Sequence, residues 1–103
     1  MPTNSDAVAQ LEGAKKQLED QTAAASGATL LQLLTAIQHI ADEVGAIEAL
    51  NLDNAAYVPQ SNSFQAATAD AQAFVATLNH LKAMFAGVGQ VAQAADTLLA
   101  MIK

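Results

Sequence analysis

The histidines His39 and His80 are the side chains of this 103-residue chain best suited to bind a transition metal. Asp42 and Glu43 follow His39, and a histidine and a carboxylate one helical turn apart can share a metal ion. Both histidines, however, fall at heptad position c of the apolar pattern described below, which points away from the packed face. A di-metal bundle also needs a Glu-x-x-His pattern on two helices, which the chain lacks. We therefore expect surface histidines, no metal site and no cofactor.

Carboxylates could also perform acid–base chemistry. The candidates are Asp42, Glu43, Glu48, Asp53, Asp70 and Asp96. All but Asp53 lie off the apolar face of an expected helix, and Asp53 lies in an expected loop, so these residues indicate a solvated acidic surface. No Gly-rich loop follows a strand to hold a phosphate, and no Ser or Thr is placed relative to a histidine in a way that suggests a nucleophile. We therefore expect no catalytic residues and no enzymatic activity.

The elements that would position these side chains are helices. After residue 63, apolar residues recur at alternating spacings of three and four, which is the heptad pattern of a helix packed along one face. This apolar seam consists of Phe64, Ala67, Ala71, Phe74, Leu78, Leu81, Phe85, Val88, Ala92, Ala95, Leu99 and Ile102. It predicts a helix over about 63–102, which would be about 60 Å long at 1.5 Å per residue.

The first half of the chain carries two weaker helical patterns. Residues 28–50 repeat the same spacing at Leu30, Leu33, Ile37 and further positions, and residues 6–25 form a weaker amphipathic pattern. Residues 51–62 collect asparagine, serine and proline, which favour a loop. The chain is thus predicted to be a single all-α domain over 1–103, with helices at about 6–25, 28–50 and 63–102.

Two weak points leave the arrangement of these helices open. The apolar phase slips near Ser26 and Gly27, and Gly87 and Gly89 interrupt the last pattern. Straight arms would give an antiparallel helical hairpin, or elongated bundle, with heptad seams. Arms folded at 26–27 and 87–89 would give a compact four-helix bundle. We favour the hairpin, because the heptad phase continues through residues 87–89 and the two arms are nearly equal in length.

The composition excludes several classes of protein. The chain has no cysteine, which excludes a disulfide scaffold and a Cys-ligated zinc module. Its net charge of -6 makes nucleic-acid binding unfavourable. No apolar run is long enough for a membrane span, and the first residues lack the basic and apolar regions of a signal peptide. We therefore expect a cytoplasmic protein, or one exported without a cleaved signal peptide.

Low charge predicts association. Only 14% of the residues are charged, against about 25% in ordinary soluble domains, so the surface is poorly protected against self-association. Large apolar residues left off the seam form the candidate interaction surface: Leu31, Leu34, Val75, Val91, Leu98 and Met101. Tyr57, in the loop, either packs back onto the helices or contacts a partner.

These features favour a non-enzymatic structural or assembly subunit. It would self-associate as a homo-oligomer, or dock on a helical protein partner, through long Ala-rich amphipathic helices. The alternative is an amphipathic adaptor or coat protein that binds an apolar surface or a partner helix.

Overall fold

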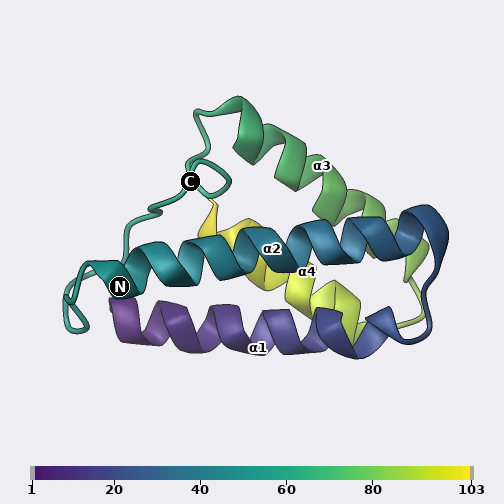
Figure 1. The fold of residues 1–103 in the computed structure, drawn as a ribbon, viewed down its shortest axis with the longest axis horizontal. Helices are drawn as coiled ribbons and strands as arrows, with labels where there is room; N and C mark the ends of the chain where they lie inside the picture. Colours follow the sequence, from purple (N-terminus) through teal and green to yellow (C-terminus); the bar gives the residue numbers. More distant parts are fainter. Residues whose placement is uncertain (1, 103) are drawn as a thin grey trace.

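The computed structural model describes residues 2–102, and this part of the chain forms a bundle of four α-helices (Figure 1). The helices are α1 (Asn4–Thr22), α2 (Gly27–Ala49), α3 (Ala69–Met84) and α4 (Gly89–Met101). Each helix contacts the next one along the chain, and α4 closes the ring against α1. The prediction of an all-α helical bundle is confirmed.

Of the two arrangements left open, the structure has the folded one. The helix expected over 63–102 is wrong as a continuous element, because α3 ends at Met84 and α4 begins at Gly89. The molecule measures 38 × 25 × 20 Å and could not contain a straight helix of about 60 Å. Folding back lets α4 pack against both α1 and α3, so it buries more apolar surface than a two-helix hairpin could.

The turn between α3 and α4 changes which residues face the core. Within α3 the buried positions follow the predicted seam from Ala71 through Phe74 and Leu78 to Leu81, whereas the seam residue Ala67, in the loop, is exposed. In α4 the seam residue Ala95 is buried as predicted, but the other buried positions come one residue earlier than the seam predicts, beginning with Val91 rather than Ala92. A shift of one residue is about 100° around a helix, and the direction change at the turn accommodates it.

Local residue chemistry sets the ends of the helices. Thr3 and Asp6 form a reciprocal capping box at the start of α1, and the Thr68 side chain accepts a hydrogen bond from the amide of Ala71 at the start of α3. Gly27 begins α2 with a φ of +60°, a left-handed conformation that glycine adopts without a steric penalty. Asn51, just after α2, has a φ of +54°, and asparagine tolerates this conformation better than most residues.

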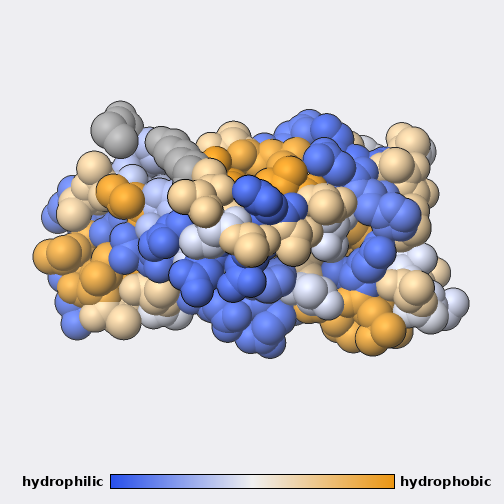
Figure 2. All heavy atoms as spheres, turned by 90° about the horizontal axis from the view of Figure 1, so that it is seen from above, coloured by the Kyte–Doolittle hydropathy of each residue, from blue (hydrophilic) through white to orange (hydrophobic). Residues whose placement is uncertain are grey.

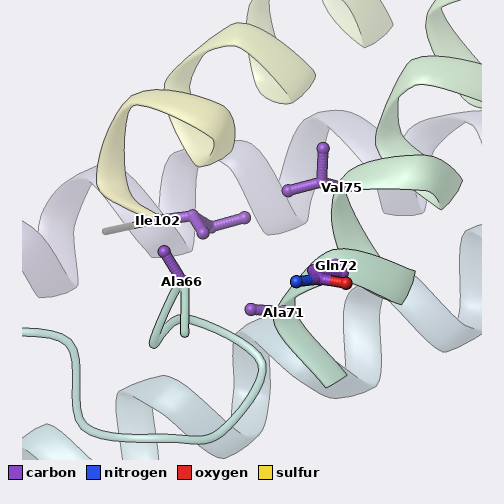
Figure 3. A pocket seen from close by; sticks show the side chains of 5 residues that line it. All are labelled: Ala66, Ala71, Gln72, Val75 and Ile102. Atoms are coloured by element: carbon purple, nitrogen blue, oxygen red, sulfur yellow. The ribbon is translucent and has the colours of Figure 1, made fainter. Parts of the chain in front are cut away.

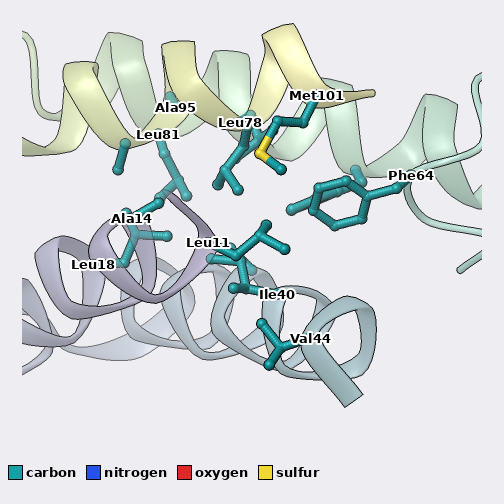
Figure 4. Packing of buried hydrophobic residues seen from close by; sticks show 14 of the residues in the cluster. Leu11, Ala14, Leu18, Ile40, Val44, Phe64, Leu78, Leu81, Ala95 and Met101 are labelled. Atoms are coloured by element: carbon teal, nitrogen blue, oxygen red, sulfur yellow. The ribbon is translucent and has the colours of Figure 1, made fainter. Parts of the chain in front are cut away.

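The core draws side chains from all four helices and from the long loop (Figure 4). Its largest fully buried members are Phe64, Phe74, Leu11, Leu18, Leu33, Ile40, Leu78, Leu81, Leu98, Glu43 and Val91. Phe64 comes from the loop over residues 50–68, which is longer than the 51–62 expected from the sequence. Within residues 2–102, no helix combines the length and the hydropathy needed to cross a bilayer.

Two opposite ends result from this topology (Figure 1). The two short interhelical turns lie together, and we call residues 23–37 and 84–88 the turn end. The loop 50–68, with the helix ends beside it, forms the loop end. The chain's N-terminal segment belongs to the loop end, where the amide of Asn4 donates to the Ala55 carbonyl at 2.9 Å and that of Tyr57 donates to the Pro2 carbonyl at 2.9 Å.

Candidate functional site

A buried carboxylate organises the loop end. Glu43, on α2, has no exposed surface, contrary to the expected solvated acidic face. Its carboxylate accepts hydrogen bonds from the Tyr57 hydroxyl at 2.6 Å, the Ser61 amide at 2.7 Å and the Gln60 amide at 2.9 Å. These donors replace the water that a buried charge loses, so they make the burial of the charge tolerable. The loop covers this side of α2, which is why an acidic residue off the seam is nevertheless internal.

Tyr57 packs back onto the helices rather than pointing toward a partner, since it is only 4% exposed. Burial is the largest cause of a raised pKa at this phenol, and the hydrogen bond and charge of Glu43 raise it further. The hydroxyl therefore remains protonated at neutral pH and donates to the carboxylate. This residue belongs to the fold and leaves the candidate interaction surface.

His39 lies on the same side of α2, one turn before Glu43, and is half-buried rather than on the surface. Its Nδ1 lies 2.6 Å from the Ser63 hydroxyl, and its ring centroid lies 4.8 Å from that of Phe74. A serine beside a histidine has the elements of a nucleophile and a base. Here the serine is 7% exposed, so in this conformation the contact attaches the loop to α2 and gives a substrate no access.

Sequence reasoning missed this pair, because 24 residues separate its members in the chain. The available signal was the spacing of His39 and Glu43, which puts both on one side of α2 beside a loop rich in hydrogen-bond donors. His80 is exposed, as expected. Over residues 2–102, histidines and carboxylates form no group of three or more that could hold a metal ion.

The turn end has the opposite character. Three large apolar side chains are exposed there, with Leu31 65% exposed, Leu34 47% and Met84 40%. A shallow cleft of about 420 Å³ lies between the two turns. It is lined by Ala24, Ala25, Ser26, Thr29, Met84 and Phe85. The Thr29 hydroxyl donates to the Met84 sulfur at 3.8 Å and so joins the two sides of the cleft.

The turn end is also free of charge. Residues 21–41 and 83–95 contain no lysine, aspartate or glutamate. The charged residues nearest to the turns are Glu19 and Asp20, near the end of α1, and Lys82, near the end of α3. Lys82 forms an exposed ion pair with Asp96. Figure 2 shows several separate hydrophobic patches on one face, at the two ends of the long axis and in its upper middle, with hydrophilic residues between them.

The loop end also exposes apolar residues, but they lie among acidic ones. Leu52 is 55% and Val58 is 58% exposed, and Asp53 stands beside Leu52 in the chain. The half of the bundle toward the loop contains seven of the ten acidic residues. They are Asp6, Glu12, Asp42, Glu43, Glu48, Asp53 and Asp70. The half toward the turns contains Lys15, Lys16, Lys82, Glu19, Asp20 and Asp96, three of each sign, and is neutral.

The remaining residues of the expected interaction surface separate into two groups. The expectation that Val91, Leu98 and Met101 lie uncovered is corrected, because α4 folds back and buries all three in the chain's own core. Val75 is half-buried and lines a small apolar pocket of about 190 Å³ at the loop end (Figure 3). The residues around this pocket are Ala66, Ala71, Gln72, Val75 and Ile102. Only Leu31 and Leu34 of the predicted set are widely exposed, and Met84 joins them.

Comparison with known proteins gives no match, whether with family models, with curated proteins or with solved structures.

Proposed function

We propose that this protein is a non-enzymatic assembly subunit that associates through its turn end. The observation that supports this most directly is the exposure of Leu31, Leu34 and Met84 on two chain segments that contain no lysine, aspartate or glutamate. Burying such side chains in a contact is favourable by about 25 cal/mol for each Å² of apolar area removed from water. The segments that carry these side chains, 21–41 and 83–95, contain no lysine, aspartate or glutamate, so burying them requires no desolvation of a charge within them.

The second support is the contrast with the rest of the polar chemistry. Glu43, Tyr57 and Ser63 all have partners within the chain and hold the loop in place. Their hydrogen bonds are used in folding, so these residues suggest a structural role. The turn end, by contrast, has apolar surface for which the described chain provides no cover.

Sedimentation velocity over a range of protein concentrations tests the proposal. We expect the wild-type chain to sediment as a species larger than its 10.6 kDa monomer, and Leu31→Glu to shift the distribution toward the monomer. Leu52→Glu is the matched control, since Leu52 is similarly exposed but lies at the loop end. A wild-type chain that stays monomeric at millimolar concentration would contradict self-association.

The alternative function, an adaptor or coat protein, is supported by the same cleft, which offers space to an apolar side chain of a partner helix. The cellular location that we propose for either function is the cytoplasm. A monomer that gains mass only in the presence of an added amphipathic helix would favour this alternative.

A further inference from the structure

We infer that the partner at the turn end is a second copy of this chain, joined turn end to turn end with the acidic loop ends pointing outward. The inference rests on the proposed function and deepens it, because it names the partner and the orientation. It is carried by the uneven distribution of charge along the bundle together with the exposed leucines.

The charge distribution selects the kind of partner. The half of the bundle toward the turns has three lysines and three acidic residues, so its net charge is zero. A strongly basic or acidic partner would find charges of both signs near the turn end, with no excess of either, and would gain little from electrostatic complementarity. The surface that fits is another apolar and uncharged one, and this chain itself provides such a surface.

The same distribution selects the orientation. Two copies with a net charge of -6 each repel one another, mainly through the seven acidic residues of the half toward the loop. The bundle is 38 Å long, so copies joined at their turn ends hold these acidic residues apart by several Debye lengths of about 8 Å at physiological salt. Contact through the loop ends would instead bring Asp53 and Glu48 of the two copies close together.

The size of the turn end is adequate for such a contact. A standard interface takes about 800 Å² and 20–30 residues from each partner. That area is roughly one-seventh of the 5385 Å² accessible surface of this chain, and 18 of the 20 residues of the turn end are at least partly exposed. A symmetric contact would place Leu31 and Leu34 of both copies in one apolar centre, as expected for a two-fold dimer.

Thiol cross-linking in single-cysteine variants tests the orientation, since the chain has no cysteine of its own. Ala86→Cys and Ala24→Cys place a thiol at exposed positions of the two turns, and Asn54→Cys places one at an exposed position of the loop. At about 10 µM protein, a short bismaleimide should link the turn variants roughly a hundredfold faster than Asn54→Cys. Proximity raises the local thiol concentration from micromolar to about millimolar. Adding Leu31→Glu to Ala86→Cys should reduce its rate to that of Asn54→Cys.

The outcomes separate the orientation from the proposed function. Cross-linking of Asn54→Cys as fast as the turn variants, with wild-type mass above the monomer, would overturn the orientation and leave self-association standing. Fast cross-linking at Ala86 that Leu31→Glu does not slow would show a contact outside this apolar surface and would also overturn the inference. A wild-type chain that is monomeric and cross-links slowly at every position would overturn both proposals.

Discussion

The two ends of this bundle differ in how their connecting segments are held in place. At the loop end, 19 residues without regular structure are held by specific hydrogen bonds, most of them to Glu43 and to the N-terminal segment. At the turn end, the connections are four residues each and need no such bonds to close. Buried polar contacts therefore lie at the end whose chain path is irregular. Exposed apolar side chains occur at both ends, and at the turn end they lie on segments that contain no charged residue.

Because the buried hydrogen bonds of Glu43 and the exposed side chain of Leu31 lie at opposite ends, mutations should affect stability and association separately. Hydrogen bonds at Glu43 are internal, so changing them should alter the free energy of unfolding and leave the contact surface intact. Leu31 is mostly exposed in the single chain, so changing it should alter association and leave the fold intact. Mutations at the two ends can test this separation directly.

The largest expected effect distinguishes a core leucine from a surface leucine. Leu98→Ala should lower the free energy of unfolding by about 4 kcal/mol, because Leu98 is fully buried and its loss leaves a cavity. Leu31→Ala should change it by less than about 0.5 kcal/mol, as exposed substitutions usually do. Urea denaturation at a protein concentration where the chain is monomeric gives both values. Equal losses would show that Leu31 is part of the core and would remove the basis for the turn-end surface.

The second effect concerns the hydrogen bonds that Glu43 accepts at the loop end. Glu43→Gln should lower the free energy of unfolding by about 3 kcal/mol. The neutral side chain weakens the three hydrogen bonds that the carboxylate accepts, and its NH₂ group, itself a donor, would face the backbone N–H donors of the loop. Glu48→Gln is the control on the same helix, since Glu48 is exposed and should shift stability by less than about 0.5 kcal/mol. Thermal or chemical denaturation measures both. Indistinguishable variants would mean that the loop does not depend on this carboxylate.

Sequence patterns were sufficient for the helices but not for the turn at 85–88. Good helix formers and the spacing around Leu78 and Leu81 predict helix without knowledge of the fold. The break after Met84 changes the buried phase by only one residue, so a heptad template runs through it undisturbed. Gly87 and Gly89 indicated locally that the helix could break. Whether it does break depends on the burial of α4 against α1, which is a matter of tertiary packing.

The candidate sites were predictable only in part. Exposure of Leu31 and Leu34 follows from their position on α2 opposite the buried residues Leu33 and Ala36. Burial of Glu43 does not follow from its position in the helix, because the loop that covers it contributes Tyr57, Gln60 and Ser61 from far along the chain. A heptad describes one face of one helix, and it contains no information about what an irregular segment will cover.

The smallest expected effect concerns the phenol that contacts Glu43. Tyr57→Phe should cost about 1.5 kcal/mol at pH 7, the low end for hydrogen bonds to charged groups, since the carboxylate keeps two amide donors. Because the fold raises the pKa of Tyr57, it favours the neutral phenol. The associated stability is complete below about pH 10, the ordinary pKa of tyrosine, and is lost as the pH rises beyond it.

The wild-type free energy of unfolding should therefore fall between pH 10 and 11.5 by up to roughly 1.4 kcal/mol per pH unit. In Tyr57→Phe the unfolding curve should be nearly flat over that range. The Lys82–Asp96 ion pair is present in both proteins and contributes at most about 1 kcal/mol. Denaturation measured in parallel at pH 8, 10 and 11.5 isolates the phenol as the difference between the two proteins. If both lose stability equally, the alkaline sensitivity comes from groups other than the Tyr57–Glu43 contact, and the loop end is held mainly by the backbone amides of Gln60 and Ser61.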